Sequence, residues 1–239
     1  MSYLENKPII MFDMDGTLLD LAYDDLIWNQ KLPERHAMTH ACTLEQSHAA
    51  LNCFYEEHKH TLAWYSSSFW SSKVGVDTLA LQYDYKKNIQ PRLGCFALLE
   101  ALKQQGYRCW IVTNADCAGL KLKLENVNLS PYFEVMVSSE EIGYAKEFIE
   151  FWQILHNKHP FDPKNVVLID DTAKVLNGAA SFGIENLITI TQPSSNKAAR
   201  NALELEYPAI NNLTELLDIL NQQSPLKQHS QKEMNVKTA

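Results

Sequence analysis

The sequence predicts an α/β fold, a doubly wound, mainly parallel Rossmann-like sheet with an inserted all-helical cap. Short unbroken apolar runs, such as residues 9–12, are typical of strands buried on both faces of a parallel sheet. After Pro91 such runs alternate with helix-like segments, which implies right-handed crossovers with helices on both faces of the sheet. Between residues 21 and 87 the strand signal is absent, and helical patterning replaces it.

The composition allows one α/β core and a smaller inserted domain. The chain has 239 residues, of which 46% are hydrophobic and 21% charged, as in ordinary globular proteins. No apolar run approaches the about 20 residues that span a membrane, and the first seven residues lack a signal peptide's apolar stretch. We therefore expect a cytoplasmic protein without a membrane partner. The formal charge of −8 disfavours a nucleic acid polymer but permits a small phosphorylated partner.

The five cysteines give no framework for disulfides or zinc. Their number is odd, and no two are spaced as Cys-x-x-Cys. We expect reduced, mostly buried thiols.

The first predicted strand, residues 9–12, leads directly into two acids and a glycine. Asp13 and Asp15 follow at the carboxyl edge of the sheet, where open α/β sheets bind ligands. Gly16 lets the backbone turn sharply and approach an anion closely. Two acids at this spacing can divide phosphoryl transfer, one attacking phosphorus and the other handling the proton. The alternative is a polar turn that merely ends a strand.

The next segment predicts the cap. Its predicted helices cover residues 21–30, 43–59 and 76–87. The first is expected to end before Pro33, the second to begin after an N-cap at Thr43, and the third to end before Pro91. Asp20 is interpreted as a hinge or helix cap. The predicted division is a core of residues 1–20 and 89–221, a cap of residues 21–88 and a disordered tail of residues 222–239.

The remaining elements alternate. The predicted strands cover residues 108–113, 133–137, 166–169 and 187–190, and the predicted helices residues 95–105, 116–126, 146–157, 173–182 and 213–220. The helix from residue 146 carries Phe148, Phe151, Trp152 and Leu155 at helical spacing. We interpret this set as core rather than as a ligand site.

Three later strands lead to polar residues that suit a phosphate site. Thr113 and Asn114 end one strand, Lys146 opens the helix after the next, and Asp170 and Asp171 end another. Hydroxyl, amide and ammonium groups stabilise phosphoryl oxygens, and carboxylates suit Mg²⁺. Each residue alone could be a turn, a solvated lysine or a helix cap. Their joint occurrence at strand ends predicts a phosphoryl-transfer site.

These four sets resemble the four motifs of the haloacid dehalogenase superfamily of phosphohydrolases, over residues from about 8 to 220. Within that superfamily the chain is similar to the bacterial GMP/IMP (purine) 5'-nucleotidases. The segments that carry this similarity are residues 14–23, 60–65, 69–70, 113–115, 121–125 and 143–147. One departure is Ala145, where proline is expected before the lysine; proline would fix the approach to the helix.

The resemblance implies a mechanism and a cofactor. Asp13 is implied to be the nucleophile that forms an aspartyl-phosphate, and Asp15 the general acid and base. Mg²⁺ is implied to bind a carboxylate oxygen of Asp13, the backbone carbonyl of Asp15 and Asp170, with Asp171 adjacent through water. The groups implied to hold the phosphoryl oxygens are Thr113, Lys146 and amides near Asp15, Gly16 and Asn114.

Substrate choice is expected to come from the cap, because the core handles only the phosphoryl group. Four aromatic residues of the cap could stack on the purine of a nucleoside monophosphate or could form the cap's own core: Trp64, Tyr65, Phe69 and Trp70. Trp64 and Tyr65 are the candidate binding residues. His60 is interpreted as a surface histidine.

Other activities fit the same motifs. A phosphoglycolate or sugar-phosphate phosphatase has the same core chemistry, and a phosphomutase shares the Asp13 and Asp15 pair. A catalytically silent binding module would share the fold, although none of the acids is missing. A dehalogenase is disfavoured because carbon–halogen displacement needs no second acid like Asp15.

Overall fold

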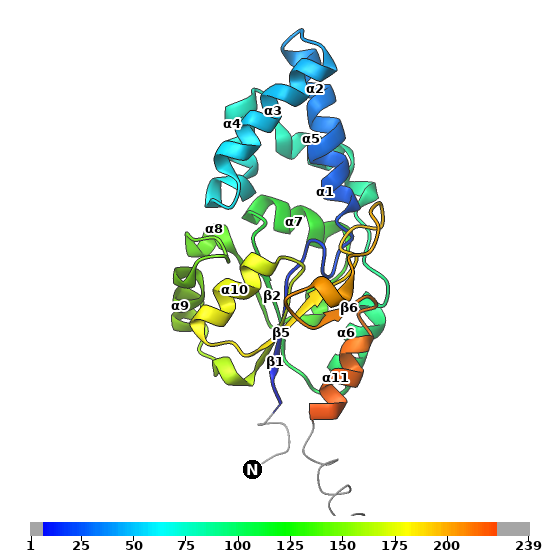
Figure 1. Ribbon diagram of the computed structural model, residues 1–239, viewed down its shortest axis with the longest axis vertical. Coiled ribbons are helices and arrows are strands. Elements are labelled where there is room, and N and C mark those ends of the chain that lie inside the picture. Colours follow the sequence, from blue (N-terminus) through cyan, green and yellow to red (C-terminus); the bar gives the residue numbers. More distant parts are fainter. Residues whose placement is uncertain (1–6, 224–239) are drawn as a thin grey trace, which may run out of the picture.

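The protein, described here from a computed structural model over residues 7–223, is built on a six-stranded parallel sheet (Figure 1). The strand order is β3-β2-β1-β4-β5-β6, and every pairing is parallel. The strands are β1 (Ile9–Phe12), β2 (Cys109–Thr113), β3 (Val135–Ser138), β4 (Val166–Ile169), β5 (Asn186–Ile190) and β6 (Ala209–Ile210). The predicted fold class is confirmed.

Helices cover both faces of this sheet. The core helices are α6 (Cys95–Gln104), α7 (Cys117–Asn126), α8 (Ser139–Ile142), α9 (Ile149–Lys158), α10 (Ala173–Phe182) and α11 (Glu215–Gln223). Side chains of β1 alternate between the faces: Ile10 and Phe12 pack with α6, α7 and α11, whereas Met11 packs with α9 and α10. Figure 1 shows α9 and α10 on one side of the sheet and α6 and α11 on the other. All four residues of β1 are buried, as expected of a central strand.

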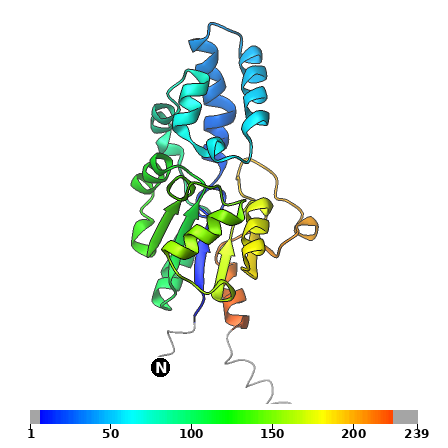
Figure 2. The ribbon, with the colours of Figure 1, turned by 90° about the vertical axis from the view of Figure 1, so that its left-hand side faces the viewer.

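The helical insertion, residues 21–88, stands above the carboxyl ends of the strands in both views (Figures 1 and 2). It contains α1 (Ala22–Leu26), a π-helical turn (Ile27–Lys31), α2 (Leu32–Thr39), α3 (Leu44–His58), α4 (Ser67–Val74), α5 (Thr78–Asp84) and 3₁₀ turns at Leu62–Tyr65 and Lys86–Asn88. Its apolar side chains are continuous with the core cluster on the α6 face of the sheet. The insertion is therefore packed onto the core.

The expected helix end before Pro33 is wrong, because helical structure runs from Ala22 to Thr39. Proline lacks an N–H and normally breaks a helix. Here the preceding π-helical turn shifts the hydrogen bonds to the i−5 pattern, as the bond from Leu32 N–H to Ile27 O shows. The next acceptor in that pattern, Trp28 O, accepts instead from the Tyr55 hydroxyl at 3.0 Å. A side chain thus replaces the missing donor.

The predicted N-cap at Thr43 is confirmed, whereas the carboxylate of Asp20 holds the chain without capping α1. Thr43 caps α3 with a full capping box, in which Thr43 and Gln46 exchange hydrogen bonds. Asp20 Oδ1 accepts from the Ala22 and Ser195 amides at 2.9 and 3.0 Å. Asp20 thus ties the start of the insertion to the loop at Ser195, and the N-cap of α1 is Leu21, which makes no side-chain capping bond.

The expected helix start at Lys146 is wrong, because α9 begins at Ile149. The residue before α9, Phe148, has an extended backbone. Its side chain is exposed, so this member of the expected apolar set lies outside the core. Phe151, Trp152 and Leu155 are fully buried, as expected. The short helix α8 and the two-residue strand β6 were not predicted, since segments of two to four residues show no periodicity.

Three further expectations concern cysteines, the tail and membranes. All five thiols are free, but only Cys95 and Cys109 are buried, so the expectation of mostly buried thiols is wrong.

Helix α11 extends through Gln223, so two residues of the expected tail are helical, and residues 224–239 lie outside the described part of the chain. Within residues 7–223, no helix has the length and apolar character needed to cross a bilayer.

Candidate active site

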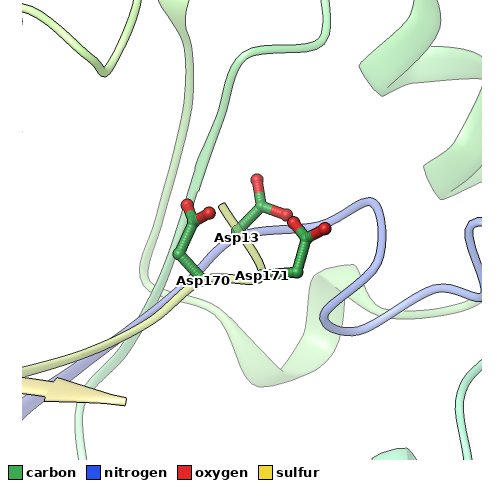
Figure 3. Close-up of side chains that lie close together, drawn as sticks. All are labelled: Asp13, Asp170 and Asp171. Atoms are coloured by element: carbon green, nitrogen blue, oxygen red, sulfur yellow. The ribbon is translucent and has the colours of Figure 1, made fainter. Parts of the chain in front are cut away.

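Three carboxylates meet at the carboxyl edge of the sheet (Figure 3). Asp13 follows β1, and Asp170 and Asp171 follow β4, the strand beside it. One oxygen of each carboxylate lies within 4.8 Å of the others. The pairing continues past the strands, since Asp13 N–H donates to Ile169 O at 2.9 Å. The register of β1 and β4 therefore brings together acids that are separated by more than half the chain.

Lys146 is the cation of this cluster. Its Nζ donates to Asp13 Oδ1 at 2.6 Å, Asp170 Oδ2 at 2.7 Å and Val112 O at 2.9 Å, one acceptor for each ammonium hydrogen. Its backbone N–H donates to Asn114 Oδ1 at 2.9 Å. These bonds fix Lys146 although Ala145 stands where proline was expected.

The cluster carries more negative than positive charge. Burial raises the pKa of Asp13 well above its ordinary value, and Lys146 opposes this. Burial also raises the pKa of Asp170. Burial, and then the neighbouring Asp170, raises the pKa of Asp171 to about 7. Three buried carboxylates with one lysine form a set of hard oxygen donors that matches Mg²⁺.

Gly16 leaves room for one of these carboxylates. A Cβ on Gly16 would lie 2.8 Å from Cγ of Asp171, and φ is +87°, in the left-handed region that favours glycine. The Gly16 amide donates to Leu19 O at 2.8 Å in this structure. Gly16 thus shapes the carboxylate cluster directly.

Thr113 and Asn114 follow β2 beside this cluster, and both are buried. Thr113 Oγ1 accepts from the Ala115 amide at 3.1 Å, which leaves the hydroxyl proton free to donate. Asn114 Nδ2 donates to Glu147 Oε2 at 3.0 Å. Both residues line the same cavity as Asp13 and Lys146.

Asp15 has a different partner. Its side chain is not one of the three clustered carboxylates, and its Oδ1 lies 2.7 Å from Nζ of Lys123 on α7. The same ammonium donates to Asp24 Oδ1 on α1 at 3.1 Å. Burial raises the pKa of Asp24 to about 6, and Lys123 opposes this. Sequence analysis missed Lys123 and Asp24 as individual residues; the signal for Lys123 is its spacing of three residues from buried Leu120.

A cavity of about 510 Å³ joins the carboxylate cluster to the helical insertion. This volume lies within the range of small-molecule sites. The acids, Thr113 and Lys146 form its floor, and Trp28, Tyr55, Trp64 and Tyr65 of the insertion line it from above. One cavity thus offers a polar end and an aromatic end.

Comparisons with known proteins show the family of this chain. The family model described as haloacid dehalogenase-like hydrolase matches residues 10–189. The chain belongs to the haloacid dehalogenase-like hydrolase family. GMP/IMP nucleotidase YrfG of Escherichia coli is 30% identical to this hydrolase over 216 residues, which cover 90% of this chain and 96% of YrfG.

Solved structures show how widely this fold is shared. A haloacid dehalogenase-family phosphatase from Thermococcus onnurineus has a TM-score of 0.74 at 21% identity, covering 89% of this hydrolase and 97% of that chain. L-2-haloacid dehalogenase from Xanthobacter autotrophicus has a TM-score of 0.60 at 14% identity, covering 91% and 100%. Because a phosphatase and a dehalogenase share it, the fold alone does not select the reaction.

The aromatic candidates of this hydrolase divide between two environments. Trp64 and Tyr65 line the cavity, whereas Phe69 does not. Trp70 borders the cavity but is only 1% exposed, and its Nε1 donates to Trp64 O at 2.7 Å, so it belongs mainly to the insertion's core. The interpretation of His60 as a mere surface histidine is incomplete, because it also lines the cavity.

Tyr65 connects the insertion to the core through Glu147, which lies in one of the family-like segments but was not predicted as a site residue. Its hydroxyl donates to Glu147 Oε1 at 2.5 Å, next in sequence to Lys146. His60 Nδ1 lies 3.8 Å from the same oxygen. Burial and then Glu147 raise the pKa of Tyr65 far above its ordinary value, so the phenol stays a donor. Trp28 and Tyr55 were also not predicted, because an aromatic residue in a predicted helix is normally assigned to the hydrophobic core.

Proposed function

We propose that this hydrolase is an Mg²⁺-dependent 5'-nucleotidase that converts GMP and IMP to nucleoside and phosphate through an aspartyl-phosphate. The observation that carries the proposal is a single cavity with a carboxylate cluster at one end and aromatic rings at the other. The 30% identity to a GMP/IMP nucleotidase over 90% of the chain supports the same substrate class. In this proposal residues 1–20 and 89–221 form the catalytic core and residues 21–88 the cap.

Asp13 is the proposed nucleophile. Lys146 holds its Oδ1, which orients the carboxylate for attack on phosphorus in line with the departing nucleoside oxygen. The new Asp13–phosphorus bond forms as the bond to O5′ breaks, and Asp15 donates a proton to O5′. Asp15 then takes a proton from the water that attacks phosphorus, which returns Asp13 and releases phosphate.

The phosphoryl oxygens are held by groups from the end of β2 and from the loop before α9. The Thr113 hydroxyl donates to one of them, and the Lys146 ammonium balances their charge. Asn114 fixes the Lys146 backbone through the bond to its N–H and so sets the position of the ammonium. The Asn114 amide completes the proposed cradle.

The proposed metal ligands are the carboxylates of Asp13 and Asp170 and the backbone carbonyl of Asp15, with Asp171 beside them. When bound, Mg²⁺ reduces the repulsion between the Asp13 carboxylate and the phosphate dianion. The raised pKa values of Asp13, Asp170 and Asp171 fit residues that a divalent cation stabilises in their ionised form.

The purine is proposed to stack against Trp64 and Tyr65, with Trp28 and Tyr55 on the same aromatic lining. Ring stacking is worth about 1–3 kcal/mol per base and needs no base-specific hydrogen bond. The ring contacts among Trp64, Trp70 and Tyr55 hold the indole of Trp64 in one orientation, which lowers the entropy cost of binding.

Phosphate release from a panel of esters tests this function. The panel comprises GMP, IMP, AMP, UMP, phosphoglycolate and glucose 6-phosphate, each with Mg²⁺ and with EDTA. We expect Mg²⁺-dependent release with the highest kcat/KM for GMP and IMP. A higher value for phosphoglycolate or the sugar phosphate would replace the nucleotidase by another phosphatase. Isomerised sugar phosphate without free phosphate would indicate a mutase, and no turnover at all a binding module.

A further inference from the structure

Lys123 lies between the proposed general acid and the first helix of the cap. It projects from α7 of the core and is 3% exposed. Its Nζ is 2.7 Å from Asp15 Oδ1 and donates to Asp24 Oδ1 and Oδ2 at 3.1 and 3.3 Å. The same ammonium lies 5.8 Å from the ring centre of Tyr23. Among the described residues, two carboxylates and a ring thus enclose one buried cation.

This arrangement places Lys123 behind Asp15 rather than in the reaction space. Lys123 does not line the cavity, whereas Asp15 and Asp24 do. Its contact with Asp15 is therefore the route by which it can affect the chemistry. Without the ammonium, the carboxylates of Asp15 and Asp24 would repel each other in a poorly solvated place, and Asp15 would lose its ion-pair partner.

We propose that Lys123, held by Asp24, is a positioning residue that fixes the Asp15 carboxyl for proton transfer to the leaving oxygen. Asp24 lies on α1, directly after the segment at Asp20 through which the chain leaves the core. A displacement of α1 would pull on Lys123 and through it on Asp15. The inference rests on the proposed function, because it assumes that Asp15 protonates the departing O5′.

The consequence depends on the leaving group. When the bond between phosphorus and O5′ of GMP breaks, its electron pair stays on O5′, a strongly basic oxygen that needs the proton of Asp15. The p-nitrophenolate anion is stable and leaves without a proton. Since kcat/KM reports the steps up to the first irreversible one, both esters report formation of the aspartyl-phosphate. A misplaced Asp15 should therefore lower kcat/KM for GMP and leave kcat/KM for p-nitrophenyl phosphate nearly unchanged.

The test compares Lys123→Met with Lys121→Met, an exposed lysine two residues earlier on the same helix. General acid catalysis contributes about 10²–10⁴-fold, so we expect Lys123→Met to lower kcat/KM for GMP by about 10- to 100-fold. In Lys123→Met, kcat/KM for p-nitrophenyl phosphate should change less than about threefold. In Lys121→Met, kcat/KM for GMP and for p-nitrophenyl phosphate should each change less than about threefold. Equal losses with both esters, or no loss with GMP, would overturn the positioning role.

Lys123→Met leaves two carboxylates without their cation, and their repulsion can unfold the protein. A second variant controls for this loss of folding. The double variant Lys123→Met/Asp24→Asn removes the repulsion as well, and thermal unfolding checks that it folds. It should show the same selective loss with GMP; equal losses with both esters would again overturn the inference.

Failure of the proposed function has a separate signature. If the unaltered protein releases phosphate from glycerol 2-phosphate but not from GMP, the nucleotidase is refuted. Glycerol 2-phosphate, which also has a basic leaving oxygen, then replaces GMP in the same comparison. If the unaltered protein cleaves neither of these two esters, both proposals fail.

Discussion

The carboxyl edge of the sheet and the helical insertion bring their candidate site residues together in different ways. At the sheet edge, Asp13 and Asp170 meet because β1 and β4 are neighbours in register. In the insertion, Trp28, Tyr55 and Trp64 reach the cavity from separate helical segments, and buried Trp70 contacts all three. In the proposed function, the reaction is therefore fixed by topology and substrate choice by side-chain packing.

The largest loss of activity is expected at the sheet edge, from Asp13→Asn. An amide cannot form the acyl phosphate, so kcat should fall by about 10³-fold or more for every ester that the unaltered protein cleaves. Thermal unfolding should show a folded protein. Turnover of GMP near that of the unaltered protein would remove Asp13 as the nucleophile.

Metal removal should affect both activity and stability, and the second effect should depend on pH. The pKa of Asp171 is raised to about 7 from 3.8, so between these values the folded state binds more protons than the unfolded state. Stability of the metal-free protein should therefore fall as pH rises through about 7. Mg²⁺ competes with these protons and should raise Tm more at about pH 8 than at about pH 5.

Unfolding of the EDTA-treated protein, followed at several pH values with and without Mg²⁺, checks this. The expected carboxylate metal site would be contradicted by a Tm that Mg²⁺ leaves unchanged at about pH 8.

Gly16→Ala should disturb the carboxylate cluster without removing any ligand. The added Cβ would lie 2.8 Å from Cγ of Asp171, so that side chain must shift. A misplacement of about 1 Å can cost about 10²-fold, and we expect kcat/KM to fall by about 10- to 100-fold. Gly143→Ala is the matched control: Gly143 has the same φ of +87° but nothing within 4 Å of the added Cβ. Equal activity losses in both variants would attribute the effect to backbone strain alone.

The smallest change in kinetics is expected in the insertion, from Trp64→Ala. Loss of one stacking ring should raise KM for GMP by about tenfold with little change in kcat. Phe69→Ala, which removes a ring that packs against the same core without lining the cavity, should lower Tm and leave KM unchanged. Similar KM values for the two variants would show that the aromatic lining does not bind the base.

The same comparison explains what sequence could predict. Strands β1 and β4 and helix α10 are marked by apolar runs and by Gly183, and their bounds agree with the predictions. The residues after those strands were found because a parallel sheet collects its carboxyl ends at one edge. Their positions were predictable; their catalytic roles remain a proposal.

The rest depends on contacts between distant segments. The helix through Pro33 needs the Tyr55 hydroxyl from another helix, and the loop at Lys146 needs the side chain of Asn114. The ion pair of Lys123 with Asp15 and Asp24 likewise joins two helices and a loop. No periodicity or spacing within one segment contains such information, so these features could be seen only in the folded chain.

The central claim is that Asp13 carries the phosphoryl group of a purine nucleotide during turnover. A single-turnover reaction with GMP and Mg²⁺, quenched in acid and analysed by peptide mass spectrometry, tests it most directly. The account predicts a transient phosphoryl group on Asp13 that disappears as phosphate is released. Phosphate release without any phosphorylated Asp13, measured fast enough to follow the first turnover, would contradict it.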